Sequence, residues 1–171
     1  VLKNMIAAAT HTIHVQVYIF SDDETGSAVA EWLMAAAQRG VKVYLLVDGY
    51  ASQGLSRAFR KKLEEGGIRF RFFEPLVRSR FFYFGRRLHH KVVVTDSNCV
   101  LVGGLNITNK YNDVGDEPAW LDFAVYMEGR IAEQLCVLCS KTWNGFLPVI
   151  KEKIPCTPVK ANKITDEECC I

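Results

Sequence analysis

The 171-residue sequence is short of several features that define particular classes of protein. Its longest uncharged apolar runs are only as long as β-strands, so we expect no membrane-spanning helix. It contains four histidines and no cluster of His, Cys, Asp and Glu at metal-ligand spacing, so we expect neither a metal ion nor a cofactor. It also lacks an internal repeat, which argues against a repeat architecture.

The six cysteines do not form a clear disulfide pattern. Their even number permits one, but Cys99 lies in an apparent buried strand, and Cys136 and Cys139 lie on an apolar helical pattern. The last two have the spacing of a metal or redox pair, yet there is no second pair and no histidine near them in the sequence. We therefore expect reduced thiols that pack in the core, in a cytosol-like compartment.

Negative charge is scarce in one part of the chain. The formal net charge is only +2, whereas residues 57–91 hold eleven Lys or Arg against three Glu, a local excess of 11 − 3 = +8. Clustered positive potential concentrates phosphate-bearing ligands, so this asymmetry predicts an anionic partner. The length and the hydrophobic content of 49% predict one globular domain with a substantial core.

The order of the predicted elements indicates the fold class. Alternating apolar residues predict a strand over residues 12–20, and apolar runs predict further strands over 41–47 and 68–73. Helical spacing between these strands predicts two helices, which end at Gly40 and at Gly66-Gly67. Alternating strands and helices predict an α/β domain, with a mixed, largely parallel sheet flanked by helices.

The rest of the sequence departs from this alternation. Residues 88–95 and 99–102 predict a hairpin, and residues 122–127 predict one more strand. A last helix is predicted after Gly129 from the spacing of Ile131, Leu135, Leu138 and Trp143. We expect the domain to span residues 1–147, and the Lys-, Glu- and Pro-rich residues 148–171 to form a linker or tail.

The stretch LHHKVVVTDSNCVLVGGLNIT, residues 88–108, combines groups suited to phosphate chemistry. Side chains alternate between the faces of a strand, so His89 and Lys91 are expected to point the same way. The hairpin is expected to return Gly103-Gly104 and Asn106 to the start of that strand. An imidazole, an ammonium and an amide on one rim, with glycines that allow close approach to the backbone, predict a phosphate site.

The complete spacing is far more specific than a lone HxK pair: His89-x-Lys91 is followed by Asp96 and then by Gly103-Gly104-x-Asn106. It resembles the HxKxxxxDxxxxxxGGxN signature of the phospholipase D superfamily, which these residues match at every position. The stretches YIFSDDETG, AAAQRGVKVYLLVDGY and WLDFAVYMEG extend the similarity over nearly the whole chain, and resemble the first half of bacterial cardiolipin synthases. The resemblance implies a phospholipase D-type catalytic domain with one copy of the motif.

The resemblance also implies a mechanism. One motif histidine attacks phosphorus to give a phosphohistidine, and a histidine from a second copy of the motif protonates the leaving alcohol and then deprotonates the acceptor. In this chain His89 and Lys91 would be catalytic. Lys91, Gly103-Gly104 and Asn106 would bind the non-bridging oxygens of the phosphate.

Two aspartates join the catalytic set through the same resemblance. Asp96 is expected to act mostly by anchoring the turn of the hairpin. Asp122 stands where family members carry a carboxylate that is hydrogen-bonded to the catalytic imidazole, and the alternative is a solvated aspartate at the end of a strand. His90 faces away from the predicted rim, and it is expected, like His11 and His14, to be structural.

The implied chemistry needs two histidines, and this chain carries one complete motif. Either two copies of the chain pair about a two-fold axis, or the chain is half of a longer protein with two motifs. The first residue, Val1, and the linker-like tail after Pro148 favour a fragment.

Residues 69–90, RFRFFEPLVRSRFFYFGRRLHH, interleave arginines with aromatic residues. This mixture suits an anionic lipid surface, and it also suits stacking of bases along a nucleic-acid backbone. We expect phosphatidyl transfer or phosphodiester cleavage on anionic phospholipid, as in cardiolipin synthases, by a cytoplasmic protein peripheral to the membrane. The alternatives are a homodimeric nuclease and a non-catalytic half that only binds lipid. The intact His89, Lys91 and Asn106 argue against the last.

Overall fold

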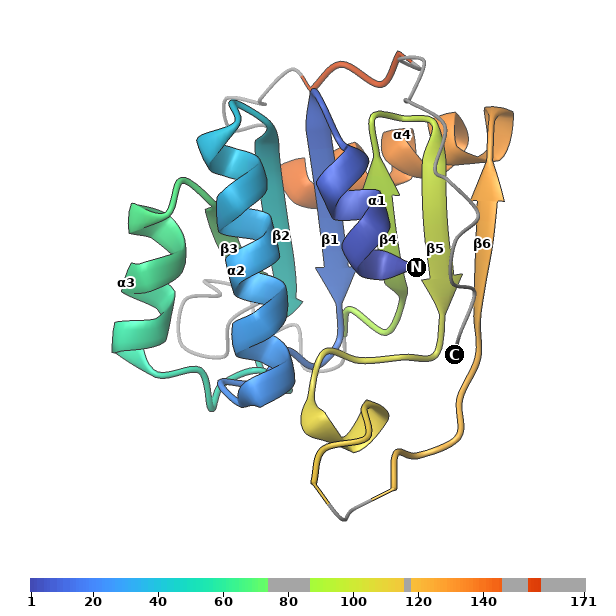
Figure 1. Ribbon diagram of the computed structural model, residues 1–171. Coiled ribbons are helices and arrows are strands. Elements are labelled where there is room, and N and C mark those ends of the chain that lie inside the picture. Colours follow the sequence, from blue (N-terminus) through green and yellow to red (C-terminus); the bar gives the residue numbers. More distant parts are fainter. Residues whose placement is uncertain (74–86, 116–117, 146–153, 158–171) are drawn as a thin grey trace.

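Six strands form the central sheet of the computed structural model, which describes residues 1–73, 87–115, 118–145 and 154–157. They are β1 (Thr12–Val17), β2 (Lys42–Asp48), β3 (Arg69–Phe73), β4 (Lys91–Thr95), β5 (Cys99–Gly103) and β6 (Ala124–Glu128). Their order in the sheet is β3-β2-β1-β4-β5-β6, as Figure 1 shows. The two strands next to the candidate site, β1 and β4, therefore lie in the middle of the sheet.

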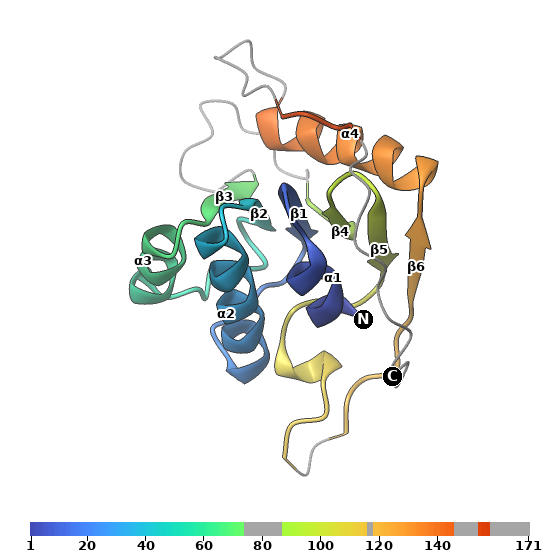
Figure 2. The same cartoon turned by 45° about the horizontal axis from the view of Figure 1, so that its top comes forward.

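Helices cover both faces of the sheet. The described helices are α1 (Leu2–Ala8), α2 (Glu24–Gln38), α3 (Arg57–Glu65) and α4 (Arg130–Asn144), with a short 3-10 helix, η1 (Asn109–Tyr111). Figures 1 and 2 show α1, α2 and α3 on one face and α4 on the other. The sequence did not predict α1.

The pairing of the strands makes the sheet mixed. β1 pairs with β2, and β2 with β3, in parallel, because α2 and α3 cross over between them. The pairs β1–β4, β4–β5 and β5–β6 are antiparallel. The predicted α/β class and mixed, helix-flanked sheet are confirmed. The sheet has more antiparallel strand pairs than the largely parallel sheet that was expected, because β4, β5 and β6 all join it in antiparallel pairs.

Alternate strand positions build a core on each face of the sheet. Ile13 and Val15 of β1 are buried on the face that α1, α2 and α3 cover. On the opposite face Val92 of β4 packs with Cys136 and Cys139 of α4. Both cysteines are fully buried, which confirms that they pack in the core.

The last helix is confirmed, but its buried face differs from the apolar pattern that predicted it. α4 buries Ala132, Cys136, Cys139 and Trp143. Ile131 and Leu138 are instead 37% and 44% exposed. Both sets of residues have helical spacing, so only packing against the sheet decides which stripe faces inward.

Three strands are shorter than predicted at the ends near the candidate site. β1 stops at Val17, β4 starts at Lys91 and β6 starts at Ala124. Just beyond β1 and just before β4, side chains accept hydrogen bonds from the backbone. The N–H of Ile19 donates to Asn106, and the N–H of Leu88 donates to Asp48. A buried N–H group needs a hydrogen-bond acceptor, and here side chains supply it in place of a neighbouring strand.

Two expectations concern residues that are partly outside the described ranges. Residues 74–86, which include most of the predicted basic-aromatic segment, are not among the described residues. Most of the expected tail is also outside them, although Ile154 is buried against Tyr44, Leu46 and Trp143. The domain boundary at residue 147 stays a prediction.

Asp96 anchors the turn of the β4–β5 hairpin. Its carboxylate accepts four hydrogen bonds of 2.8 Å, from the backbone N–H groups of Thr10, His11 and Thr12 and from the hydroxyl of Thr10. Asp96 is 2% exposed and has a left-handed backbone, with φ of 52°. The hydrogen bonds tie the turn to the start of β1.

We predict that Asp96→Asn lowers the free energy of unfolding by about 3 kcal/mol. Asparagine tolerates the left-handed backbone, but its amide NH2 would face N–H donors and leave some of them without an acceptor. Urea unfolding measures the change. Asp113→Asn is the control, because among the described residues Asp113 accepts one exposed hydrogen bond, from Ala119, and its replacement should cost less than about 1 kcal/mol. Equal unfolding midpoints for the two variants would refute this role of Asp96.

Candidate active site

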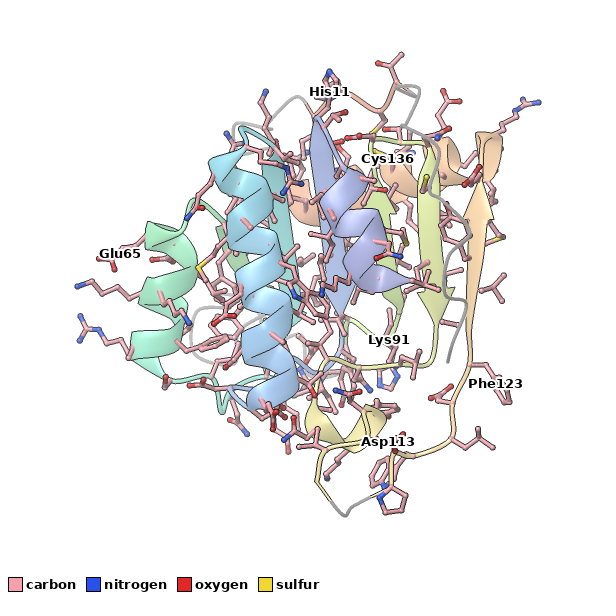
Figure 3. The ribbon with its side chains drawn as sticks, in the orientation of Figure 1. His11, Glu65, Lys91, Asp113, Phe123 and Cys136 are labelled. Atoms are coloured by element: carbon pink, nitrogen blue, oxygen red, sulfur yellow. The ribbon has the colours of Figure 1, made fainter. Side chains whose placement is uncertain are left out.

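The residues of the predicted phosphate site meet at one end of the sheet. Here the carboxyl ends of β1, β2 and β5 lie beside the start of β4, since β4 runs antiparallel to its two neighbours. Lys91, the first residue of β4, pairs with Gly103, the last residue of β5. Figure 3 shows Lys91 at this end and His11 at the opposite end. We call this end of the sheet the rim.

His89 and Lys91 lie together on the rim. The ammonium of Lys91 donates a hydrogen bond of 2.9 Å to the carbonyl oxygen of His89. The His89 side chain is exposed and precedes the first residue of β4. An exposed imidazole beside an ammonium is available to a phosphate from solvent.

His90 turns to the opposite face, as predicted. Its Nε2 lies 2.7 Å from the Oε1 atom of Gln16, whose amide in turn donates to the carbonyl oxygen of Cys139 in α4. Burial lowers the pKa of His90, and the charge of Lys91 lowers it further. A neutral, hydrogen-bonded imidazole under α4 fits the expected structural role.

Asp48 holds the backbone just before His89. It is fully buried at the end of β2, and its Oδ2 accepts a 2.9 Å hydrogen bond from the N–H of Leu88. Its Oδ1 accepts from Tyr50 and Ala51. Sequence reasoning did not select Asp48, although a charged residue ending a buried apolar strand was a usable signal.

Asn106 joins two loops at the rim. Its side chain is 7% exposed, its Oδ1 accepts from the N–H of Ile19 at 2.9 Å, and its Nδ2 donates to the hydroxyl of Tyr111 at 3.1 Å. Asp23, the N-cap of α2, steadies the same loop by accepting hydrogen bonds from Thr108 and Asn109. The aspartate-rich turn after β1 is therefore an architectural part of the site.

Asp122 lies over the glycine pair and not on the imidazole. A Cβ atom on Gly104 would collide with both carboxylate oxygens of Asp122. The carboxylate accepts a 2.7 Å hydrogen bond from the N–H of Phe123, and no hydrogen bond joins it to His89 in the described part of the chain. β6 begins at Ala124, so Asp122 belongs to the preceding loop and not to a strand, and its role beside the catalytic imidazole stays a prediction.

Asp96 is not part of the rim. It bonds to His11, which Figure 3 shows at the far end of the sheet from Lys91. A strand rises about 3.3 Å per residue, so the five steps of β4 separate Asp96 from Lys91 by roughly 16 Å. Its grouping with the catalytic residues is therefore corrected in favour of the structural role that was also expected.

Tyr18 is a rim residue that sequence reasoning missed. Its ring stacks on the imidazole of His89 with a centroid distance of 4.4 Å and an interplanar angle of 29°. The ammonium of Lys91 lies 5.4 Å from the centroid of the same ring. The only signal in the sequence was an aromatic residue at the end of a buried strand.

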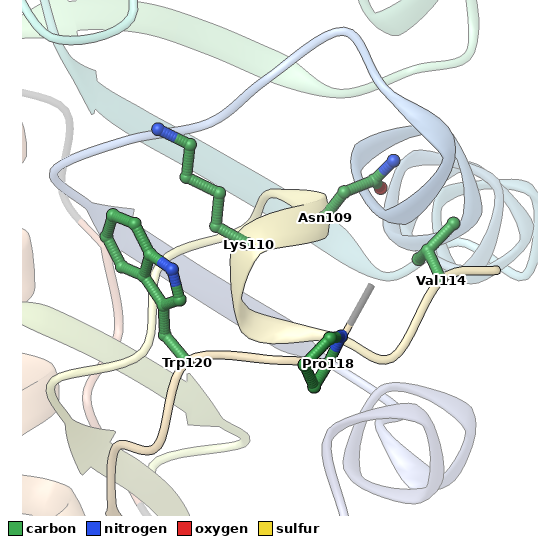
Figure 4. A pocket seen from close by; sticks show the side chains of 5 residues that line it. All are labelled: Asn109, Lys110, Val114, Pro118 and Trp120. Carbon is green, nitrogen blue, oxygen red and sulfur yellow. The ribbon is translucent and has the colours of Figure 1, made fainter. Parts of the chain in front are cut away.

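A cavity of about 580 Å³ lies next to the rim (Figure 4). Asn109, Lys110, Val114, Pro118 and Trp120 line it. Tyr111 links it to the rim, because its hydroxyl accepts from Asn106 and its ring lies 5.9 Å from that of Trp120. The lining combines the apolar side chains of Val114, Pro118 and Trp120 with Lys110, whose ammonium lies 5.0 Å from the centroid of the Trp120 ring.

Among the described residues no group of three or more His, Cys, Asp or Glu side chains could hold a metal ion. No helix within the described ranges is long and apolar enough to cross a membrane.

Comparisons with known proteins agree with the motif. Residues 2–135 match the family model described as cardiolipin synthase, PLD-like domain. The chain is 37% identical over 134 residues to cardiolipin synthase B of Escherichia coli, covering 76% of this chain and 32% of that protein. It is 34% identical over 147 residues to a cardiolipin synthase of Halalkalibacterium halodurans, covering 83% of this chain and 29% of that protein. The chain thus spans about a third of the length of these curated relatives.

Solved structures share the fold. Nuc from Salmonella typhimurium, a phospholipase D family member, superposes with a TM-score of 0.63 at 24% identity, covering 84% of each chain. Phosphatidylserine synthase from Haemophilus influenzae superposes with a TM-score of 0.64 at 20% identity, covering 80% of this chain and 32% of that one. At these identities the likeness is one of fold.

We predict different effects of a methyl group at each of the two rim glycines. A Cβ on Gly103 would collide with the backbone of Phe123 and Ala124, so Gly103→Ala should cost about 3 kcal/mol of unfolding free energy. The three atoms nearest to a Cβ on Gly104 all belong to the side chain of Asp122, which can rotate away, so Gly104→Ala should cost less than about 1 kcal/mol. Urea unfolding compares the two variants. A larger loss for Gly104→Ala would contradict this packing.

Proposed function

The chain belongs to the family of cardiolipin synthase, PLD-like domains, and from that premise we propose that it carries half of an active site for phosphatidyl transfer or phosphodiester cleavage on anionic phospholipids. The observation that supports this most is the meeting of His89, Lys91 and Asn106 at one end of the sheet, beside two glycines. The activity, substrates and partners of the whole protein are all part of the proposal.

In the proposed reaction an imidazole nitrogen of His89 attacks phosphorus. A P–N bond forms, the P–O bond to the leaving alcohol breaks, and the imidazole of a second motif gives the alcohol oxygen its proton. That second imidazole then takes the proton of an acceptor hydroxyl, whose oxygen attacks phosphorus and releases His89. A lipid hydroxyl as acceptor gives transfer, and water gives hydrolysis.

Lys91 and Asn106 bind the non-bridging phosphate oxygens in this proposal. Negative charge on these oxygens rises as phosphorus gains its fifth ligand, so a fixed ammonium and a fixed amide stabilise the transition state. Asn106 suits the role because its Oδ1 accepts from Ile19 and its Nδ2 donates to the hydroxyl of Tyr111, which leaves one amide hydrogen to offer to a phosphate. Gly103 and Gly104 belong to the proposed phosphate site through the motif, and their lack of side chains lets Asp122, Phe123 and Ala124 pack closely against this end of β5.

The second motif comes from another copy of the chain or from the remainder of a longer protein. Its histidine must approach His89 from outside this domain, because His90 is engaged on the opposite face by Gln16. The coverage of about a third of each cardiolipin synthase relative favours the longer protein. The protein would act at the cytoplasmic surface of the membrane, without a cofactor.

Phospholipid is favoured as the substrate because the two relatives named above, at 37% and 34% identity, are cardiolipin synthases. The cavity beside the rim, with an ammonium and apolar walls, suits an amphiphilic ligand. A homodimeric nuclease is the second candidate, and the fold likeness to Nuc over 84% of both chains favours it.

We predict that His89→Ala lowers turnover of the assembled enzyme at least about a thousandfold, because the nucleophile is lost. His90→Ala is the matched control: it should keep turnover within about threefold, and it should lose about 1 kcal/mol of stability with the Gln16 bond. The assay follows phosphatidylglycerol conversion, with circular dichroism to check folding. Normal turnover by a folded His89→Ala enzyme would end the proposed mechanism.

We predict that this 171-residue chain alone is a monomer that does not hydrolyse bis-p-nitrophenyl phosphate. One motif supplies one imidazole to the rim, so turnover should appear only when a second motif is added. Light scattering and the hydrolysis assay on the same sample give the answer. A tight dimer that turns over would instead favour the homodimeric nuclease.

A further inference from the structure

We propose that Tyr18 is a positioning residue that holds His89 and Lys91 in a fixed relation to each other. The inference rests on the proposed function, because it names a third side chain on which the two reacting groups depend. It concerns the aromatic ring of Tyr18 and not its hydroxyl. Tyr18 lies outside the HxK motif, in the segment that follows β1.

The contacts of Tyr18 join two groups with different tasks. Its ring lies 4.4 Å from the imidazole of His89 in a stacked arrangement and 5.4 Å from the ammonium of Lys91. Aromatic rings attract both partners, the imidazole by stacking and the ammonium through the negative charge of the ring face. One ring therefore sets the separation of the nucleophile and the phosphate-binding cation.

Among the described residues, little else orients the ring of His89. The residue is exposed and precedes β4, so strand pairing does not fix it. Neither imidazole nitrogen forms a hydrogen bond within the described part of the chain, and the Asp122 carboxylate is bound to the N–H of Phe123. Tyr18 is the ring-to-ring contact that remains for His89 among the described residues.

Tyr18 itself sits on an immobilised piece of backbone. Its carbonyl oxygen accepts from the hydroxyl of Ser52 at 3.1 Å, and the same hydroxyl oxygen accepts from the N–H of Phe20 at 3.0 Å. The N–H of Ile19, between them, donates to Asn106. Ser52 and Asn106 are 2% and 7% exposed, so both anchors are buried.

This arrangement lets the backbone that follows β1 position an exposed imidazole. The buried anchors fix residues 18–20, these fix the Tyr18 ring, and the ring restrains His89 and Lys91 at the rim. A nucleophile that is misplaced by about 1 Å can lose on the order of a hundredfold in rate. Asn106 holds the segment that carries Tyr18, and it is also a proposed phosphate ligand. The three groups proposed to face the phosphate, His89, Lys91 and Asn106, are therefore linked through this segment.

The test compares Tyr18→Leu, which removes the ring, with Tyr18→Phe, which keeps it. The first readout needs no activity: NMR of histidine ring protons in the labelled chain, with the His89 signals assigned from their loss in His89→Ala. The ring-current shift of the His89 protons should persist in Tyr18→Phe and disappear in Tyr18→Leu. Tyr18→Met repeats the test if Tyr18→Leu does not fold.

Trp32→Leu is the matched control. Trp32 of α2 also has a lysine ammonium, that of Lys3, near its ring, at 5.8 Å, and it packs partly against the core outside the rim. Its replacement should leave the His89 signals unchanged. This separates loss of the stack from a general loosening of the fold.

The second readout is turnover of the protein supplied with a second motif. Tyr18→Leu should lower kcat by about 10- to 100-fold with KM within about threefold, and Tyr18→Phe should keep kcat within about threefold. Unmoved His89 signals or an unaltered kcat in Tyr18→Leu would overturn the inference. An equal loss in Tyr18→Phe would also overturn it, because the hydroxyl would then be the acting group.

Failure of the proposed function gives a different result. If the unsubstituted protein with a second motif turns over no phosphodiester, the proposed reaction is wrong. The NMR comparison then decides the inference alone. Retention of the ring-current shift in Tyr18→Leu would refute the positioning of His89 by Tyr18, and its loss would support it.

Discussion

The register of the β4–β5 hairpin is the constraint on which the candidate site depends. Lys91 pairs with Gly103, and this pairing brings the start of one strand beside the glycine pair that ends the other. A slip of one residue would turn every side chain of β4 to the opposite face. Val92, Val93 and Val94 are buried on alternate faces and are the same residue type, so they do not select the register. The turn selects it, because Asp96 is held there by hydrogen bonds from the backbone of Thr10, His11 and Thr12.

Buried polar side chains hold the loops in place by accepting backbone hydrogen bonds, as strand pairing holds the sheet. Asp48, Asp96 and Asn106 are each less than a tenth exposed, and each accepts hydrogen bonds from the backbone of a segment distant in the sequence. Leaving one such donor unpaired would cost about 1–3 kcal/mol, so these contacts hold the irregular segments in one conformation. Two of them act at the rim, and Asp96 acts at the opposite end of the sheet.

Sequence reasoning recovered the hairpin, the orientation of His89 against His90, and the return of Asn106 to the rim. These features follow from the two-residue period of a strand and from a short turn, both of which are local. The same reasoning placed Asp122 in a strand and missed Tyr18 and Asp48. It also missed which stripe of α4 is buried, since Ala132 and Cys136 compete with Ile131 and Leu138 on equal helical spacing.

The sequence by itself determined the order of the strands and of the helices α2, α3 and α4, the spacing of the motif and the family of the chain. Periodicity, turn residues and motif spacing depend on residues that are close together in the sequence, so they can be recognised without knowledge of the packing. Only the tertiary structure decided that Tyr18 lies against His89, that Asp48 holds Leu88, and that Asp96 is remote from the rim. Those contacts join segments far apart in the chain, and they depend on how the middle strands of the sheet are ordered.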